Sequence, residues 1–494
     1  MAGGPGTSRD RWWIGGAFLA AAGILAGCAP GDTAPVATPV PTTSPAAETS
    51  PGGDVGSPTP IVIDTDVSSD DVMAIPFLLL EPSVDVLAVN VVGTGLVHCD
   101  QGLQVVTDLL AALDRTDVPI SCGGEMPVGA GHEFPAEWRA TADAGFGLSL
   151  ERRPASIPNR TPADRMRDAI AAAGRPITIV ATGPTTNLAE AFTADPSLVP
   201  GIERIVAMAG AVNVPGNVQE QDAFLPAEWN VYADPVALDT VLASGVPVTL
   251  VPLDATRDAP VTQDFIDRLA QDHAAAPADI TYELLLRGRL TTADSFWDPL
   301  AAVLAVDDTI GTFETMRIAV DTTSGATSGR TLVAADGTEV RVATAADTSA
   351  FEARFLDGLR RGAPRPVPFE VSGTFHVATD GTTCSTDVPA EVSAGTWLID
   401  VESSAPNLAA IPIVHFHEGA GWADLLEHVA TEADPTQQPS FLDVGAIQFF
   451  DKPGSAPVVA ELTPGTWGVV CLLFDSETAP GTVALPPGPF TVVP

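Results

Sequence analysis

The sequence has little positive charge. Its 494 residues include 23 Lys and Arg against 63 Asp and Glu, so the formal net charge at pH 7 is −40. This balance repels nucleic-acid phosphates and anionic lipid headgroups, and it excludes both as main partners. Hydrophobic residues make up 45% of the chain, which excludes a wholly disordered protein. We expect about three domains, or one large α/β domain and a smaller module.

The N-terminus lacks an apolar run long enough for a comfortable membrane span. Arg9 and Arg11 precede an apolar stretch, Trp12–Gly27, which is followed directly by Cys28. Small residues before a cysteine resemble a bacterial lipoprotein signal. This resemblance implies that Cys28 is lipidated and anchors an exported protein to the cell membrane on the extracytoplasmic side. The alternatives are a plain secretory signal or a weak anchor helix.

Residues 29–59 have almost no large apolar side chain and are rich in Pro, Thr, Ser, Ala and Gly. They cannot bury enough surface to fold, so we expect a disordered spacer between the membrane and the rest of the chain.

A second proline-rich segment, Arg361–Pro368, separates two regions of different character. The sequence therefore predicts one domain over residues 60–362 and another over residues 369–494.

The region 60–362 alternates short β-branched runs with longer segments of helical spacing, such as Gln101–Leu113 and Thr161–Ala173. The short runs are almost entirely apolar, as expected for strands that are covered on both faces. This order predicts an α/β fold with a mainly parallel sheet flanked by helices. The predicted strands are Ile61–Ile63, Val86–Val92, Ile177–Ala181, Ile205–Met208 and Val246–Val251.

Four carboxylates follow the first predicted strand. Asp64, Asp66, Asp70 and Asp71 fall beyond the carboxyl end of that strand, where open α/β sheets bind ligands. Helix capping and the positive end of a helix explain one or two of them, but not four. A hard divalent cation with oxygen ligands would neutralise their mutual repulsion, and Ca²⁺ suits an exported protein.

Two further segments carry polar residues at expected helix starts. Glu228 and Asn230 stand two residues apart before Asp234-Pro235, so both side chains can hydrogen-bond the hydroxyls of a sugar. Taken alone, this segment is equally a turn with an Asp-Pro helix start. Asp298-Pro299 alone would be a simple N-cap.

Together these segments resemble the calcium-dependent nucleoside hydrolases of the inosine-uridine type. That family has a strand leading to D-x-D-x-x-x-D-D, then T-G-P-x-T-N-L, E-x-N-x-x-x-D-P and a late Asp-Pro helix start. The resemblance implies a nucleoside-hydrolase-like fold that cleaves the N-glycosidic bond of ribonucleosides into base and ribose. The matching segments here are Asp64–Asp71, Thr182–Leu188, Glu228–Pro235 and Asp298-Pro299.

The resemblance also implies a role for each matching residue. Asp66 would accept a proton from a calcium-bound water that attacks C1′. Carboxylates near the ribose would stabilise an oxocarbenium-like transition state. The implied Ca²⁺ ligands are Asp66, Asp71, the Thr182 carbonyl and Asp298. The residues implied at the ribose hydroxyls, or at the sugar side of the metal shell, are Asp70, Asn217, Glu228 and Asn230.

The residue before Asp298 bears on how the leaving base is bound and protonated. Many family members have a His there that protonates or orients the leaving base, whereas this chain has Trp297, which cannot donate a proton as an imidazolium can. A purine-preferring branch has Trp at this point and sandwiches the base with a second Trp, to which Trp138 looks similar. Stacking between two indoles favours a bicyclic base, so the resemblance implies purine nucleosides as substrates. The alternative is that both are core or rim tryptophans.

Two departures from the family pattern favour an alternative function. Gly93-Thr94 replaces the usual Gly-Asn, and Val218–Ala227 is longer than the usual spacing. The alternative is a nucleoside- or sugar-binding surface lipoprotein that has lost turnover. A haloacid-dehalogenase-type phosphatase would also have an Asp-x-Asp after its first strand, but it gives Asp70-Asp71 and Glu228–Pro235 no role. A purely structural envelope protein would leave the acidic cluster without a purpose.

The C-terminal region changes in composition. Residues 366–494 contain one Lys, no Arg and sixteen Asp and Glu, with short strand-like runs between Gly and Pro turns. This pattern predicts a separate all-β module, and Pro464–Cys471 resembles the late P-G-x-Y/W-x-x-x-C run of a cupredoxin-type β-sandwich. No His or Met follows Cys471, so no copper site is expected, and His415 and His417 are expected on one exposed strand face. We expect a binding or spacing module.

Export would permit disulfides among the four remaining cysteines. Their spacing does not determine the pairing, although Cys384 and Cys471 could join the two sides of the sandwich. His98 and Cys99 follow Thr94 closely and are assigned no catalytic role. The four cysteines are Cys99, Cys122, Cys384 and Cys471.

Overall fold

The computed structural model describes residues 57–155, 159–220, 223–431, 436, 438–450, 453–474, 481–486 and 488–494. The expected signal peptide, its lipidation site Cys28 and the spacer up to residue 56 lie outside the described residues. Thr59, which we expected in the spacer, already belongs to the first strand. In the described part of the chain, no helix is both long enough and apolar enough to cross a bilayer.

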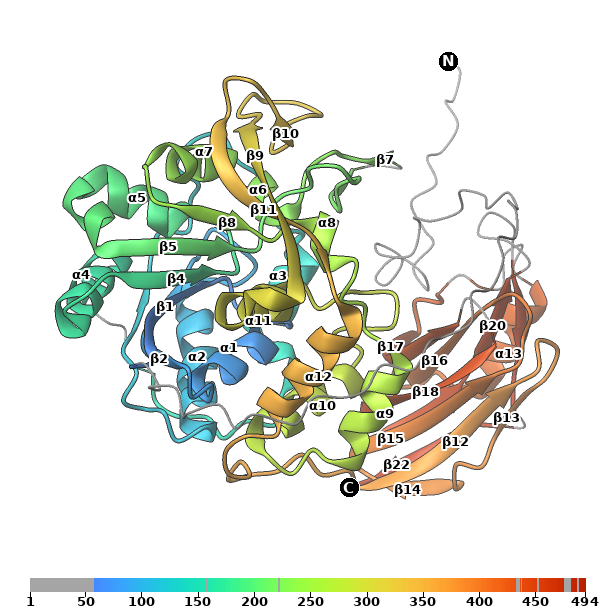
Figure 1. Ribbon diagram of the computed structural model, residues 1–494. Coiled ribbons are helices and arrows are strands. Elements are labelled where there is room, and N and C mark those ends of the chain that lie inside the picture. The colour runs from blue at the N-terminus through green and yellow to red at the C-terminus, as the bar shows by residue number, and fades with distance from the viewer. Residues whose placement is uncertain are drawn as a thin grey trace, which may run out of the picture.

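A nine-stranded sheet forms the centre of the N-terminal domain, in the order β10-β9-β11-β8-β5-β4-β1-β2-β3 (Figure 1). All neighbours from β11 to β3 are parallel. Only β9 runs antiparallel to its neighbours β10 and β11, so the predicted mainly parallel α/β fold is confirmed. The strands are β1 (Thr59–Thr65), β2 (Val84–Val91), β3 (Ile120–Cys122), β4 (Ile177–Ala181), β5 (Ile202–Ala207), β8 (Val248–Leu250), β9 (Gly311–Val320), β10 (Thr331–Val333) and β11 (Thr338–Ala346).

The sheet is apolar on both faces because helices cover both. On β1, Ile61 and Ile63 pack into one buried cluster, whereas Val62 between them packs into another. Side chains alternate along a strand, so a strand buried on both faces needs apolar residues at every position. The first cluster includes residues of α1 (Asp71–Leu79), α2 (Cys99–Ala112), α10 (Ala276–Leu286), α11 (Trp297–Val306) and α12 (Thr348–Leu359), and the second includes α4 (Pro162–Ala173), α5 (Thr186–Ala194) and α7 (Pro235–Ala243).

The helix starts follow local sequence signals. Thr161 caps α4 by accepting a hydrogen bond from the Asp164 amide, and the Asp164 side chain accepts from the Thr161 amide in return. Gly174 ends the same helix at φ 61°, a left-handed conformation that glycine adopts without strain. The remaining short elements of this domain are α3 (Ala136–Asp143), β6 (Gln219–Glu220), β7 (Ala223–Phe224), α6 (Trp229–Ala233), α8 (Leu253–Thr256), α9 (Gln263–Gln271) and three 3₁₀ turns, Gly145–Gly147, Pro196–Gly201 and Asp308–Ile310.

Glu81, just after α1, is bound by two arginines from the region of α12. Burial alone would raise the pKa of Glu81, but hydrogen bonds from Arg354, Ser83 and Arg361 lower it to about 2. Since the folded pKa lies below the ordinary 4.5, this carboxylate contributes stability above pH 4.5 that is lost as the pH falls towards 2. We expect Glu81→Gln to lower the free energy of unfolding at pH 7 by about 2 kcal/mol, and by less at pH 3. Urea unfolding of both proteins at the two pH values measures this difference, and an equal loss at both would contradict the assignment.

The C-terminal module contains two sheets. One has the order β13-β12-β15-β18, and the other has the order β14-β22-β19-β16-β20-β21, with β17 pairing to β16. Residues from both sheets, such as Ile399 and Trp467, share one buried cluster. The strands are β12 (Gly373–Thr379), β13 (Cys384–Thr386), β14 (Glu391–Ser393), β15 (Gly395–Ser403), β16 (Leu408–Phe416), β17 (Leu442–Phe450), β18 (Gly454–Leu462), β19 (Gly465–Val469), β20 (Cys471–Phe474), β21 (Thr482–Ala484) and β22 (Phe490–Val493).

Two expectations for this module need correction. It is not all-β, because Trp422–Thr431 forms helix α13, whose Leu425 is buried. His415 is not simply on an exposed face, since its ring stacks on Trp467 at 4.6 Å, whereas His417 is exposed and pairs with Asp443 at 3.0 Å. The pairing that the sequence left open is Cys384 with Cys471 and Cys99 with Cys122.

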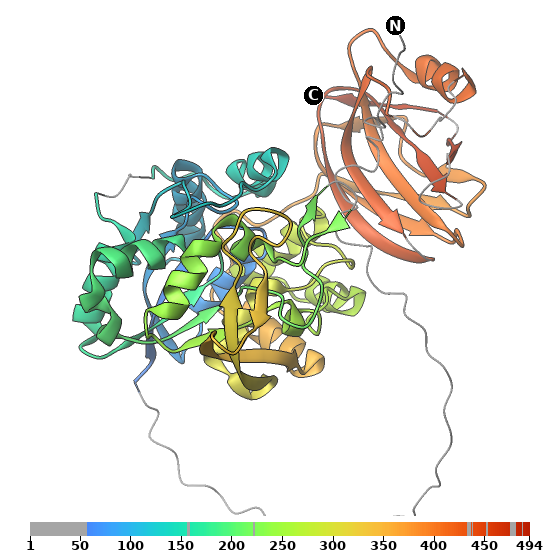
Figure 2. The ribbon, with the colours of Figure 1, turned by 90° about the horizontal axis from the view of Figure 1, so that it is seen from above.

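The proline-rich segment Arg361–Pro368, which separates the two predicted domains, packs against the N-terminal domain. Arg365 is buried and forms ion pairs with Asp279 and Glu283 of α10. Leu286, Phe369 and Val459 form a small apolar cluster at the same junction. The two modules therefore contact each other through α10 and β18, and they lie side by side in both views (Figures 1 and 2).

Candidate functional site

The carboxyl end of β1 carries the first two carboxylates of the site. Asp64 is the penultimate residue of β1, and Asp66 follows the strand directly. Val67 comes next with φ 54°, a left-handed conformation that is strained for a β-branched residue. Its amide donates to the Thr65 hydroxyl at 3.0 Å, which helps to hold this turn. Strain of this kind is concentrated at functional sites.

Asp66 is enclosed by two glycines and one backbone amide. The Leu96 amide donates to Asp66 Oδ2 at 2.9 Å. A Cβ atom on Gly95 would lie 2.2 Å from the Asp66 Cβ, and one on Gly183 would lie 2.8 Å from it. No larger residue fits at either position without moving the Asp66 side chain.

The late Asp-Pro segment meets the acidic cluster, although it is far away in the sequence. The Ser68 hydroxyl donates to Asp70 Oδ1 at 2.6 Å and lies 3.1 Å from Asp298 Oδ2, 230 positions along the chain. The Asp298 amide donates to Asp70 Oδ2 at 3.0 Å, and the Ser68 amide donates to Asp71 Oδ2 at 2.8 Å. The structure thus brings Asp70, Asp71 and Asp298 together around Ser68.

All five carboxyl groups are almost fully buried, with at most 5% of each residue exposed: Asp64, Asp66, Asp70, Asp71 and Asp298. Burial raises the pKa of Asp66 well above its ordinary value, and the negative charge of Asp71 adds to the effect. Burial and the charges of Asp70, Asp71 and Asp66 do the same to the pKa of Asp298. Burial also raises the pKa of Asp64 to about 7 and that of Asp71 to about 6.

The buried carboxyl groups lack a compensating positive charge from the described side chains. In the described part of the chain, none of these five carboxyl groups forms an ion pair with Arg, Lys or His. Asp71 Oδ1 is buried without a hydrogen bond of good geometry, although the hydroxyls of Thr182 and Thr65 lie near enough to lower the Asp71 pKa. Buried negative charge without compensation is costly, and a cation with oxygen ligands would remove that cost. Among the described residues, no three His, Cys, Asp or Glu side chains are grouped closely enough to hold a metal ion as they stand.

A second group of polar residues lies beside the carboxylates. Glu228 caps α6 and accepts hydrogen bonds from the amides of Asn230 at 2.8 Å and Gly210 at 3.0 Å. Burial raises the Glu228 pKa to about 7, and the negative charge of Asp70 is close enough to contribute to this rise. Asn230 Nδ2 donates to the Met208 carbonyl at 3.0 Å and lies 3.4 Å from the Thr182 carbonyl oxygen. Asn217 Oδ1 accepts from the Trp229 amide at 3.1 Å.

Comparison with known proteins identifies the larger module. The family profile described as inosine-uridine preferring nucleoside hydrolase matches residues 61–353, more than half of the chain. The chain belongs to this family. The pyrimidine-specific ribonucleoside hydrolase RihA of Escherichia coli O139:H28 is 34% identical over 211 residues, which cover 42% of this chain and 65% of RihA. The match therefore spans slightly less than two thirds of this curated relative.

Solved structures support the same fold. The inosine-uridine preferring nucleoside hydrolase of Bacillus anthracis superposes with a TM-score of 0.54 at 20% identity, covering 61% of this chain and 99% of that one. An inosine-guanosine nucleoside hydrolase superposes with a TM-score of 0.53 at 26% identity, again covering 61% of this chain and 99% of the other. The nucleoside-hydrolase-like fold thus accounts for the larger module and leaves the C-terminal sheets as an addition.

The tryptophans of this nucleoside hydrolase family member lie in different surroundings. Trp297 begins α11 next to Asp298 and is half-buried against the core. Trp138 of α3 contacts Trp229 edge-on, with ring centroids 5.4 Å apart. Among the ring contacts of the described residues, none joins Trp138 to Trp297. The expected sandwich between these two rings stays a prediction, and Trp229 is an additional aromatic residue beside Glu228.

Three contributors to the site were missed from the sequence. Ser68 and the Leu96 amide bind the carboxylates directly, as described above. Asn187 donates to Asp64 Oδ2 and to the Val91 carbonyl, both at 3.0 Å. Asn187 is the Asn of the T-G-P-x-T-N-L segment, so the motif already contained the signal. A backbone amide such as that of Leu96 leaves no signal in the residue type.

Proposed function

We propose that the chain is an exported, lipid-anchored and calcium-dependent ribonucleoside hydrolase that splits purine nucleosides into base and ribose. The main support is the meeting of Asp298 with Asp70 and Asp71 around Ser68, within Coulombic reach of Asp66. A site of buried carboxylates at the carboxyl ends of parallel strands suits both a hard cation and a sugar that becomes positively charged. The family assignment gives this arrangement its reaction class.

The Ca²⁺ ligands in this proposal are Asp66, Asp71, Asp298 and the Thr182 carbonyl. The ion, when bound, would make a water molecule acidic enough to act as a nucleophile near neutral pH. Asp66 would accept the proton of that water, and the Leu96 amide would keep the Asp66 side chain oriented for this task. The Thr182 amide donates to the Asp64 carbonyl at 2.8 Å, which fixes the Thr182 backbone close to the end of β1.

The ribose side of the site would use Asp70, Asn217, Glu228 and Asn230. Glu228 is held by the Asn230 amide at the start of α6 and by the Gly210 amide after β5, so its position is fixed before any ligand binds. Negative charge at Asp70 and Glu228 would stabilise positive charge that develops on the ribose in the transition state. A site organised in advance loses little free energy to rearrangement during the reaction.

Trp297 is expected to determine base preference. An indole beside Asp298 would stack on a bicyclic base but would not protonate a departing pyrimidine. RihA, by contrast, is a pyrimidine-specific enzyme by name. We expect the wild type to hydrolyse inosine and guanosine faster than uridine and cytidine. Trp297→Ala is expected to reduce kcat/KM for inosine at least about tenfold, with a smaller effect on uridine.

Initial rates of ribose release from inosine, guanosine, adenosine, uridine and cytidine test this preference in both proteins. Trp422→Ala, in α13 of the other module, is a matched control that removes an indole away from the site and should leave all five rates unchanged. Faster hydrolysis of uridine than of inosine by the wild type would reject the purine preference and leave the reaction class intact. No hydrolysis of any of the five would reject the proposed function.

The export part of the proposal is supported by the two disulfides, because such bonds persist mainly in oxidising compartments. Metabolic labelling with a fatty acid in a bacterial host tests the anchor. We expect the label on the wild type and not on a Cys28→Ser variant. Equal labelling of both would exclude Cys28 as the lipidation site.

One observation favours a binding protein without turnover. The Thr94 hydroxyl donates to the Gly124 carbonyl oxygen at 3.3 Å, at the position where the family commonly has Asn. Calorimetry that detects tight inosine binding, together with no release of ribose, would support this alternative.

A further inference from the structure

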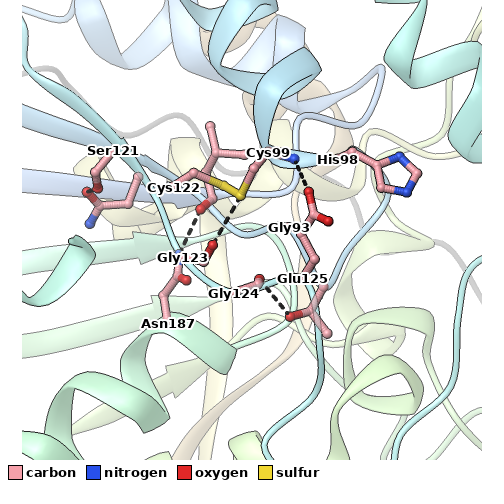
Figure 3. Close-up of a disulfide and its surroundings, with 12 residues drawn as sticks. Gly93, His98, Cys99, Ser121, Cys122, Gly123, Gly124, Glu125 and Asn187 are labelled. Carbon is pink, nitrogen blue, oxygen red and sulfur yellow. Dashed lines mark hydrogen bonds between the residues drawn. A yellow bond between two sulfur atoms is a disulfide. The ribbon is translucent and has the colours of Figure 1, made fainter. Parts of the chain in front are cut away.

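A single loop, Val92–His98, lies between the disulfide Cys99–Cys122 and the acidic cluster. We propose that this bond positions the loop Val92–His98, and through it the Asp66 side chain, for hydrolysis (Figure 3). Its effect on turnover rests on the proposed function, whereas its effect on the loop does not. The two cysteines are positioning residues in this account, because neither is proposed to touch the substrate.

The loop forms one wall of the Asp66 site. The Leu96 amide donates to Asp66 Oδ2 at 2.9 Å, and Gly95 is so close to Asp66 that a Cβ atom there would collide with the carboxylate. A shift of this loop would therefore remove a hydrogen bond from Asp66 and open the space beside it. Small displacements at a catalytic group can reduce turnover by one to two orders of magnitude.

One side of the loop is held by the disulfide and by the segment that follows Cys122. Cys99 Sγ would lie 3.0 Å from a Cβ atom on Gly93, so the sulfur packs directly against the loop. The Cys99 amide donates to Glu125 Oε1 at 2.8 Å, and the Thr94 hydroxyl lies 3.3 Å from the Gly124 carbonyl oxygen. Figure 3 shows Gly93, Gly124 and Glu125 beside the disulfide. Gly124 and Glu125 belong to the segment that follows Cys122 in the chain.

The segment after Cys122 also contacts Asn187, which binds Asp64 of the acidic cluster. The Gly123 amide donates to the Val91 carbonyl at 3.1 Å, and a Cβ atom on Gly123 would lie 1.8 Å from Asn187 Oδ1. Asn187 in turn donates to Asp64 Oδ2 at 3.0 Å. The disulfide thus joins two loops. One of them contacts Asp66, and the other contacts Asn187, the hydrogen-bond partner of Asp64.

A covalent bond is needed at this place because β3 is a weak anchor. It is a three-residue strand at the edge of the sheet, and among the described residues it pairs with β2 alone. Short edge elements open locally at low free-energy cost. Three contacts from α3 also hold the loop: Arg139 donates to the Gly93 carbonyl at 2.9 Å, the His98 amide donates to Asp143 Oδ1 at 2.9 Å, and His98 Nδ1 lies 2.7 Å from Asp143 Oδ2. We therefore expect loss of the disulfide to loosen the loop without unfolding the domain.

The second disulfide supplies a matched control. Cys384 and Cys471 are buried in the C-terminal module, whereas Cys99 and Cys122 are half-buried. The test uses the full chain as wild type, as Cys99→Ser/Cys122→Ser, and as Cys384→Ser/Cys471→Ser. The measurements are kcat and KM on inosine at saturating Ca²⁺, and amide hydrogen exchange in peptides that cover Gly93–His98.

We expect Cys99→Ser/Cys122→Ser to lower kcat about tenfold or more and to speed exchange in the loop at least about tenfold, while far-UV circular dichroism stays unchanged. The control variant should keep the wild-type kcat and the wild-type exchange in the loop. Wild-type kcat and exchange in Cys99→Ser/Cys122→Ser would overturn the proposal. If the wild type hydrolyses no nucleoside, the proposed function fails, and the exchange rates alone still decide whether the bond fixes the loop.

Reduction of the folded wild type covers the case in which the variant does not fold. Dithiothreitol would transfer two electrons and two protons to the half-buried disulfide, giving two thiols, and would itself close to a cyclic disulfide. We expect the loss of kcat to follow the appearance of thiols at Cys99 and Cys122, and reoxidation to restore it. Full activity with both cysteines reduced would contradict the proposal.

Discussion

Asp66→Asn is expected to lower kcat for nucleoside hydrolysis at least about a thousandfold, with little change in stability. The amide oxygen of asparagine can still accept the hydrogen bond from the Leu96 amide, so the side chain should keep its place. The variant loses the negative charge and the proton acceptor, which the proposed reaction needs. Ribose release under substrate saturation measures kcat, and thermal unfolding measures stability.

Asp85→Asn is the matched control for this change. Asp85 is an exposed aspartate of β2 on the same sheet, so its replacement removes one negative charge away from the site. This control should keep the wild-type kcat. A kcat for Asp66→Asn within tenfold of the wild type would show that Asp66 is not the proton acceptor.

Removal of calcium is expected to abolish turnover. The carboxylates at Asp66, Asp71 and Asp298 have no compensating cation among the described side chains, so an ion would hold them in the arrangement that the reaction requires. Treatment with EGTA should reduce the rate at least about a hundredfold, and Ca²⁺ added in excess should restore it. Mg²⁺ should restore less, because it demands a tighter octahedral shell.

Calcium should also raise the midpoint of thermal unfolding. A ligand that binds only the folded state at about 100 times its Kd stabilises that state by about 2.7 kcal/mol, which corresponds to several degrees. Cys384→Ser/Cys471→Ser should show the same calcium-dependent rise, since its change lies in the other module. Unchanged activity and an unchanged midpoint after EGTA would remove calcium from the account.

The parallel part of the sheet could be predicted because its strands are buried on both faces. Runs such as Ile177–Ala181 are buried at every position and apolar at all but Thr178, and the observed β4 has the same bounds. Strand β9, which lies between β10 and β11, is mostly exposed or half-buried, so its sequence carries no comparable signal. Helix α13 was missed because ten residues of helical pattern stand among short strand-like runs. Burial on both faces, rather than strand propensity, made the prediction possible.

The site could be predicted as far as its residue types, through the motifs, but not in its contacts. The segment Asp64–Asp71 identified the carboxylates, whereas the bond network around Ser68 depends on a residue 230 positions away. The Trp138 side chain contacts Trp229, and that pairing has no signature in the spacing. The disulfide Cys99–Cys122 joins the ends of two loops, and only the fold shows that these loops are adjacent.

Calorimetric titration of Ca²⁺ into the chelator-treated full chain tests the central claim most directly, with Asp298→Asn and Asp85→Asn measured beside the wild type. The account predicts one bound Ca²⁺ in the wild type and in Asp85→Asn, and binding at least about tenfold weaker in Asp298→Asn. No binding by the wild type, or equal affinity in Asp298→Asn, would contradict a calcium site shared by the first strand and the late Asp-Pro helix.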